Sequence, residues 1–258
     1  MCPLTGNGSL LQSFVNSFAR EPALSICLSN VREVSLSKTS KLVAFYCNYN
    51  PQNFEPRLFT EHAISYPEPI KGAVAKRQTE FLAGRFLAKK CLSKLRCYDF
   101  DVAIGRSRNP LWPKGLTGTI THDNGLAICV IGHLSEFSGI GLDVETILAE
   151  QDAILIQKTI MNKDEIQLLK NSSLELEIIV SLVFSVKESI FKALFPSIGY
   201  YFDFDAVAVE NIDLKQRKLM CRVTKRLSDT ISNGMRISVD FEIHNYRVIS
   251  FVRLGCDY

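Results

Sequence analysis

Apolar residues follow two different spacings along the chain, and each spacing predicts a different kind of element. From 73 to 97 they recur three or four positions apart without proline, which predicts a long helix. The same spacing predicts a second long helix over 174–194. Alternating or continuous apolar runs predict strands at 42–46, 102–105, 118–121, 126–131, 139–145, 204–209, 219–223, 237–243 and 246–252.

The remaining segments are less regular. Prolines punctuate the first 70 residues, which we interpret as short strands and loops, and 225–231 is predicted to be helical. Each half of the chain thus has one long helix and several strands. This symmetry predicts an α+β fold of two similar subdomains, residues 1–136 and 137–258, each with its long helix against a small, mainly antiparallel sheet.

Composition places the chain among ordinary globular proteins. It has 258 residues, of which 47% are hydrophobic and 22% charged. Its eight cysteines, Cys2 among them, form no CxxC pair or Cys/His cluster, so we expect reduced thiols rather than a zinc site. Arg20 is the first basic residue, and no apolar run reaches the roughly 20 residues of a membrane helix. We therefore expect a cytoplasmic protein without a membrane span.

Basic residues are concentrated in two segments. Residues 71–114 hold 11 basic and three acidic side chains, and 215–226 hold six basic ones. Both segments favour an anionic ligand or an acidic partner, and solvated charges on a helix face explain them equally well. With the interleaved aromatic residues, the first segment also raises the alternative of a nucleic-acid-binding protein.

Asp143 and Glu145 alternate with apolar residues on the strand 139–145, so both carboxylates project from one face. Such a pair can hold Mg²⁺ together with phosphate oxygens, although a solvent-facing acidic pair is the commoner meaning of this pattern. Glu188 and Lys192 lie four residues apart on the second long helix and share a face. They form either an ordinary helical ion pair or, next to the first two acids, a clamp for metal and phosphate.

Two further groups could bind phosphate. Thr121 and His122 follow a short strand, where a hydroxyl and an imidazole could hold an anion, or where the histidine is simply satisfied in a turn. Arg77 and Arg85 lie on the first long helix, and guanidinium groups suit phosphates because they donate in a planar fork. Taken singly, each arginine is more typical of a surface charge.

Five motifs together resemble those of the 4′-phosphopantetheinyl transferases, most closely the enterobactin-synthase component D type of bacterial siderophore pathways. They occur in the family's order over about half the chain. The motifs are R-x-x-E-F-x-x-G-R at 77–85, P-L-W-P-x-G at 110–115, G-T-I-T-H at 118–122, G-I-G-L-D-V-E at 139–145 and F-S-x-K-E-S-x-x-K-A at 184–193. Their ordered combination is far more specific than any one of them.

The resemblance implies an activity and an architecture. The activity is transfer of the phosphopantetheine arm of coenzyme A to a serine of an apo acyl, aryl or peptidyl carrier protein, with release of adenosine 3′,5′-bisphosphate. The context it implies is enterobactin or another siderophore, or other nonribosomal peptide biosynthesis. It also implies Mg²⁺, with Mn²⁺ as the alternative ion, and a pseudo-dimer of the two subdomains with coenzyme A in a cleft between them. A monomer without a nucleic-acid partner is the simplest expectation.

Position by position, the resemblance also implies residue roles. The metal ligands are Asp143, Glu145 and Glu188, and the catalytic residues are Glu188, Lys192 and Asp143. Thr121 stands where serine is usual, which preserves the hydroxyl. Coenzyme A contacts are expected from Arg77, Arg85, Arg106, Ser107, Arg108, Thr121, His122, Asp143, Glu188, Lys192 and Phe202.

Glu188 is then expected to accept the proton of the carrier serine, directly or through a metal-bound water, while Lys192 stabilises the departing bisphosphate. The alternative within this resemblance is a non-catalytic module that binds coenzyme A or the carrier. The complete set of acids argues against that module, because affinity alone does not require converging carboxylates.

Overall fold

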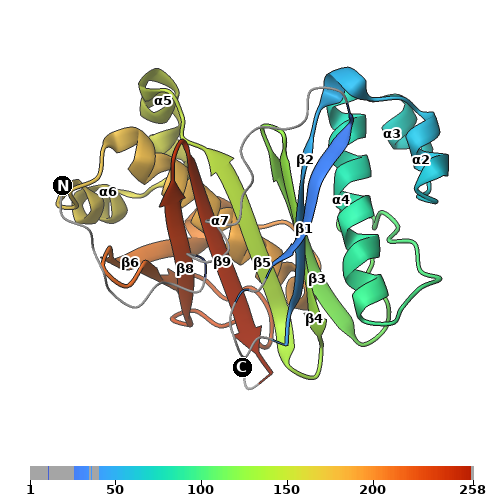
Figure 1. Cartoon of the computed structure of the whole chain (residues 1–258). Helices are drawn as coiled ribbons and strands as arrows, with labels where there is room; N and C mark the ends of the chain where they lie inside the picture. Colours follow the sequence, from blue (N-terminus) through green and yellow to red (C-terminus); the bar gives the residue numbers. More distant parts are fainter. Residues whose placement is uncertain (1–10, 12–25, 35, 37–40, 257–258) are drawn as a thin grey trace. The chain divides into compact units, whose positions relative to one another are not determined.

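The structure is a computed structural model that describes residues 11, 26–34, 36 and 41–256. Cys2, Arg20 and much of the first 40 residues lie outside the described residues. The chain forms two compact units that meet in sequence between Glu136 and Phe137. Figure 1 shows both units.

The first unit is a four-stranded antiparallel sheet with one long helix on a face. The strand order is β1-β2-β4-β3, and helix α4 runs along β2 and β4 (Figure 1). Its core joins buried side chains of the helix, such as Leu87 and Cys91, to Cys129 and Ile131 of the sheet. The elements are β1 (Leu28–Val34), β2 (Val43–Tyr49), η1 (Pro51–Asn53), α2 (Arg57–Glu61), α3 (Glu68–Lys71), α4 (Ala75–Lys94), β3 (Leu116–Asp123) and β4 (Leu126–His133).

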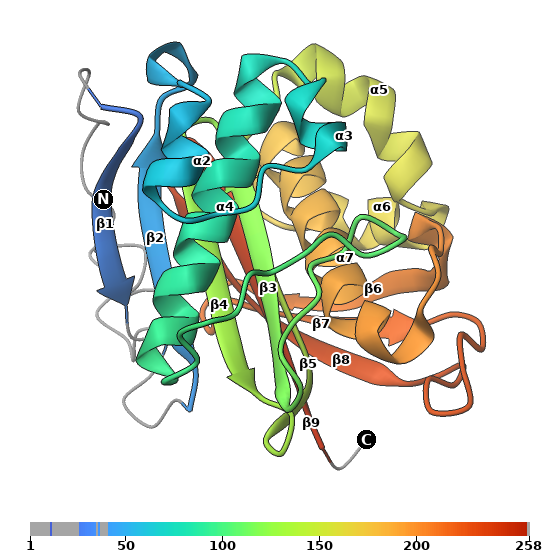
Figure 2. The same ribbon diagram turned by 90° about the vertical axis from the view of Figure 1, so that its right-hand side faces the viewer.

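The second unit is a five-stranded antiparallel sheet in the order β5-β9-β8-β7-β6. Helix α7 packs on β5 and β9, α5 packs beside α7, and α6 packs on β6 (Figure 2). Helix α7 ends at Gly199, whose φ of 76° is the left-handed conformation that commonly ends helices. The elements are β5 (Phe137–Thr146), α5 (Glu150–Ile160), α6 (Lys163–Lys170), α7 (Leu176–Ile198), η2 (Phe204–Ala206), β6 (Val207–Asp213), β7 (Lys218–Val223), β8 (Arg236–His244) and β9 (Arg247–Gly255).

Two glycines let α7 lie directly on β5. A Cβ atom at Gly141 would be 1.7 Å from the carbonyl oxygen of Ser189, and one at Gly139 would be 1.9 Å from that of Ala193. Any larger residue would therefore have to push the helix backbone away from the strand. The G-I-G part of the sequence motif thus sets the distance between Asp143 on the strand and the acid and lysine on the helix.

The α+β class predicted from the sequence is confirmed, with both long helices and most strands where expected. Some details were wrong. Residues 102–105 form only an isolated bridge, Ile104 to Pro110, and 225–231 is irregular rather than helical. Helices α5 and α6 were not predicted, and α2 and α3 lie in the segment that was interpreted as short strands and loops. Among the described residues, no helix is long and apolar enough to cross a membrane.

Candidate functional site

Four arginines and a histidine line one pocket of the first unit, here called the arginine pocket. It has a volume of about 590 Å³ and is formed by α4, β3 and the loop between Ile104 and Pro110. The members that the sequence predicted are Arg77, Arg85, Arg106, Arg108 and His122. Glu80 is the one carboxylate among the described residues that line it. The pocket therefore carries a large excess of positive charge, which suits an anion.

Arg85 is the most buried of these cations, with 8% of its surface exposed. Its guanidinium lies 4.5 Å from the centre of the Phe81 ring and donates to the carbonyl oxygen of Ala103 at 3.5 Å. Its buried Nε has no hydrogen-bond partner among the described residues. Burial lowers the pKa of Arg85 to about 10, so the group remains a cation at neutral pH. A buried cation with an unused donor indicates an anion-binding position.

Arg106 and Arg108 lie on a tight loop opposite α4. The backbone N–H of Gly105 donates to the carbonyl oxygen of Asn109 at 2.7 Å, and that of Arg108 donates to the carbonyl oxygen of Gly105 at 2.9 Å. Arg108 has a φ of 63°, so the turn bends within the basic segment. Both arginines line the arginine pocket, whereas Ser107 between them is not among its lining residues.

The Thr121-His122 pair is divided by the strand that carries it. His122 and Ile120 line the arginine pocket, and Thr121 is buried on the opposite face of β3. Successive residues of a strand point to opposite faces, so the two side chains cannot share this pocket. The predicted contact of Thr121 with coenzyme A stays a prediction, and it would have to be made from the other face.

Asp143, Glu188 and Lys192 form the second group, here called the acid–lysine site. Lys192 Nζ donates to Asp143 Oδ1 at 2.6 Å and to the carbonyl oxygen of Leu142 at 3.2 Å. Burial raises the pKa of Glu188; the charge of Lys192 acts against this rise, and that of Asp143 adds to it. The second unit thus brings two carboxylates and one ammonium group together across β5 and α7.

The donors of the acid–lysine site fit a hard divalent cation. Asp143 and Glu188 supply carboxylate oxygens, the ligands that Mg²⁺ prefers, and the charge of Asp143 disfavours that of Glu188. Glu145 lies two residues further along the strand and is half-buried. The described part of the chain holds no group of three or more His, Cys, Asp or Glu side chains arranged to bind a metal. The three-acid ligand set therefore stays a prediction.

Phe202 lies in an aromatic pocket beside Glu188. The pocket has a volume of about 240 Å³, and its walls come from α7 and the segment that follows it. The Phe191 ring is stacked on Tyr201 at 5.3 Å between centres and lies 5.1 Å from Phe202. An apolar pocket of this kind suits the least polar part of a ligand, next to the carboxylate.

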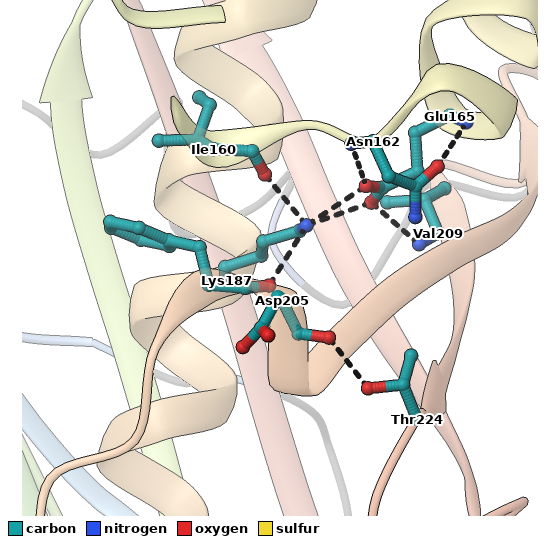
Figure 3. A network of polar contacts seen from close by, with 8 residues as sticks. Ile160, Asn162, Glu165, Lys187, Asp205, Val209 and Thr224 are labelled. Carbon is teal, nitrogen blue, oxygen red and sulfur yellow. Dashed lines mark hydrogen bonds and ion pairs between the residues drawn. The ribbon is translucent and has the colours of Figure 1, made fainter. Parts of the chain in front are cut away.

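A buried ion pair holds this region together, and the sequence did not suggest it. Lys187 Nζ contacts Glu165 Oε1 at 2.9 Å and donates to the carbonyl oxygens of Ile160 at 2.7 Å and Phe204 at 3.1 Å, as Figure 3 shows. Glu165 also accepts from the backbone N–H groups of Asn162 and Val209, both at 2.8 Å. Its fully bonded carboxylate makes burial of the pair tolerable. The network ties α5, α6 and η2 to the turn of α7 that carries Glu188.

Most of the second basic segment is neutralised within its own unit. Five of its six cations pair with acids, in the pairs Arg217–Glu242, Lys218–Asp240, Arg222–Glu210, Lys225–Asp205 and Arg226–Asp229. This pairing favours the interpretation of residues 215–226 as ordinary surface charges of strands and turns, rather than as a binding segment. In contrast, Arg106 and Arg108 have no ion-pair partner among the described residues.

Fold and sites together define an α+β protein with an arginine-rich pocket and an acid–lysine site. Two family models match the chain: the 4′-phosphopantetheinyl transferase N-terminal domain matches residues 66–132, and the 4′-phosphopantetheinyl transferase superfamily matches residues 139–240. The chain belongs to the 4′-phosphopantetheinyl transferase superfamily.

Curated relatives are found in several bacteria. The chain is 35% identical over 144 residues to "Enterobactin synthase component D" of Salmonella typhi, covering 55% of this chain and 59% of that protein. It is 33% identical over 150 residues to the protein of the same name in Escherichia coli K12, covering 57% and 68%. It is 28% identical over 154 residues to "4'-phosphopantetheinyl transferase Npt" of Nocardia iowensis, covering 55% and 67%. The match thus spans little more than half of the Salmonella relative.

Proposed function

We propose that this protein transfers the 4′-phosphopantetheine group of coenzyme A to a serine of an apo carrier protein. The observation that carries the proposal is the arginine pocket, in which the buried Arg85 faces the same space as Arg106, Arg108 and His122. Coenzyme A is a substrate rich in phosphate, and the pocket offers cations for its adenosine 3′-phosphate. The names of the relatives support carriers of siderophore or other nonribosomal peptide synthesis.

The acid–lysine site supports the chemical step. We assign Mg²⁺, or Mn²⁺ in its place, to Asp143 and Glu188 with Glu145 as the third ligand; when bound, the ion would neutralise charge on the pyrophosphate. The carrier serine oxygen forms a bond to the phosphorus that bears the pantetheine arm, and the bond from that phosphorus to the bisphosphate breaks. Glu188 accepts the serine proton, for which a raised pKa is suitable. Lys192 donates to the departing phosphate.

The remaining expectations belong to the same proposal. Residues 1–136 would bind the nucleotide, and residues 137–258 would hold the metal and receive the carrier. We propose a location in the cytoplasm, because the described cysteines, Cys97 and Cys256 included, are free thiols. We also propose a monomer, because two similar subdomains within one chain make it the simplest oligomeric state. The aromatic pocket beside Glu188 would receive the pantetheine arm, because it is the apolar part of the site.

Intact-mass spectrometry tests the reaction. Apo aryl, peptidyl and fatty-acid carrier proteins are incubated with the protein, coenzyme A and Mg²⁺, with EDTA as the control. We expect a metal-dependent gain of one phosphopantetheine group on at least one carrier and its loss in Glu188→Gln. Asp229→Asn removes an acid whose side chain is 97% exposed and serves as the matched variant that keeps activity. Coenzyme A binding without any gain on a carrier would favour the non-catalytic module.

A further inference from the structure

A carboxylate in the pocket where an anion is expected requires an explanation. Glu80 lies one turn after Arg77 on α4, and only 11% of its side chain is exposed. A negative charge at this depth repels a phosphate more strongly than a solvated one would. Glu80 therefore weakens anion binding unless it arranges the groups that bind the anion.

Glu80 is in contact with two of those groups. Its Oε2 lies 3.5 Å from Arg77 Nη1 and 3.7 Å from His122 Nδ1, and Arg77 Nη1 lies 3.0 Å from His122 Nε2. A guanidinium can only donate, so Nε2 of the histidine must be the acceptor. The proton of the neutral ring is then on Nδ1, the nitrogen that faces Glu80. The three side chains thus fix both the position and the tautomer of His122.

A phosphate that enters the pocket changes this arrangement. It competes for the donors of Arg77, and once Arg77 turns to the phosphate, His122 Nε2 loses the donor that it accepted from. The ring then lies between two negative groups, Glu80 and the phosphate, and both favour the imidazolium form. The cations that oppose protonation are Arg77 and Arg85 of α4 and Arg106 and Arg108 of the loop.

We propose that Glu80 is a specificity-determining residue that lets His122 take up a proton from solvent when a phosphate monoester binds. Protonated Nε2 becomes an additional donor to the phosphate, and the charge of Glu80 balances the new positive charge. This inference rests on the proposed function, because it takes the 3′-phosphate of coenzyme A as the group recognised. It explains why a carboxylate lies among four arginines.

Calorimetric titration of the full chain with adenosine 3′,5′-bisphosphate tests the inference. Titrations near pH 7.5 in two buffers of different ionisation enthalpy give the number of protons taken up with the ligand. We expect a larger uptake for the wild type than for Glu80→Gln or His122→Gln. Glu68→Gln makes the same change of charge on exposed α3 and should equal the wild type. The protonation of the free ligand is common to all variants and cancels in the comparison.

A second measurement distinguishes a Glu80 that positions His122 from a Glu80 that only repels the phosphate. The preference for adenosine 3′,5′-bisphosphate over adenosine 5′-monophosphate should fall about tenfold in Glu80→Gln, the effect of losing roughly one charge-assisted hydrogen bond. A carboxylate that acts only by repulsion predicts the opposite: in Glu80→Gln the bisphosphate binds more tightly, and its preference over the monophosphate rises. His122→Gln, which lacks the titrating ring, decides the same question if Glu80→Gln does not fold.

The outcomes distinguish this inference from the proposed function. Bisphosphate binding with equal proton uptake in the wild type, Glu80→Gln and His122→Gln would overturn the inference and leave the proposed function standing. A wild type that does not bind the bisphosphate would overturn both. Uptake that is lost in both variants, together with the reduced preference, would establish the role of Glu80.

Discussion

At the scale of single residues, the surroundings of Glu188 work against its ionisation. Burial and the charge of Asp143 raise its pKa above 4.5, and Lys192 only partly opposes them. The native state therefore binds this proton more tightly than the unfolded state does. It follows that the contribution of Glu188 to stability is lost as pH rises from about 4.5 through the raised pKa, and the loss persists at neutral pH.

The raised pKa of Glu188 gives a prediction about stability that can be tested without an activity assay. Without metal at pH 7.5, Glu188→Gln should melt at a higher temperature than the wild type, and the difference should vanish in acid, where the wild-type carboxyl is protonated. Added Mg²⁺ should raise the melting temperature of the wild type alone, because the variant lacks one ligand. Thermal unfolding with EDTA or Mg²⁺ measures both effects, with Asp229→Asn as the control. An equal response of Glu188→Gln to Mg²⁺ would remove Glu188 from the ligand set.

At the scale of elements, the contact between α7 and β5 sets the acid–lysine site. Gly141→Ala would place a methyl group 1.7 Å from the Ser189 carbonyl oxygen, so α7 must move away from the strand. We expect a loss of about 1–3 kcal/mol in unfolding free energy, as for other overpacked contacts, and a weaker Mg²⁺ response. Denaturant titration and thermal unfolding with Mg²⁺ provide the measurements. Gly72→Ala, with nothing within 4 Å of the added carbon, is the matched control. Equal behaviour of the two variants would show that the close contact is not required.

The elements also show what local patterns can predict. The long helices were predictable because apolar spacing persists over many turns in each. The conformation of residues 225–231 was not predictable in the same way. Leu227 and Ile231 are spaced as in a helix and are buried, but they lie in an irregular segment, where the Leu227 N–H donates to the Ile231 carbonyl oxygen at 2.9 Å. Helix α6 is short, and its N-terminus is fixed by Asn162 and Glu165 in a capping box. The pattern N-x-x-E was visible there, but the ion pair of Glu165 with Lys187 spans 22 residues and has no local signal.

The same limits apply to the sites. Arg77, Arg85 and His122 were predicted from motifs, and the structure brings them to one pocket. The sequence placed Thr121 and His122 at the end of a short strand, whereas β3 continues to Asp123, and its period of two puts the two side chains on opposite faces. Glu80 stood in the R-x-x-E motif one turn from Arg77, which was the available signal for their contact. The contact of Glu80 with His122 depends on how α4 packs on β3, which a local sequence pattern cannot predict.

At the scale of the whole molecule, the two basic segments differ in what their charges can do. Lys225 and Arg226 form exposed pairs with Asp205 and Asp229, and such pairs contribute about 0–1 kcal/mol each. A paired charge also has little field beyond the Debye length of about 8 Å at physiological ionic strength. Arg106 and Arg108 carry no such partner among the described residues, so their charge is available to a ligand.

This difference predicts opposite results for two sets of charge-removing variants. Arg106→Gln with Arg108→Gln should weaken adenosine 3′,5′-bisphosphate binding at least about tenfold and flatten its dependence on salt. Lys225→Gln with Arg226→Gln removes the same charge and should leave this affinity within about twofold, because both lysine and arginine are already paired. Calorimetry at two salt concentrations measures the bisphosphate affinity of both double variants. The kcat/KM with an apo carrier shows whether the carrier binds to 215–226. A tenfold fall in kcat/KM for the Lys225→Gln, Arg226→Gln variant alone would mean that the carrier displaces the paired acids and binds this segment directly.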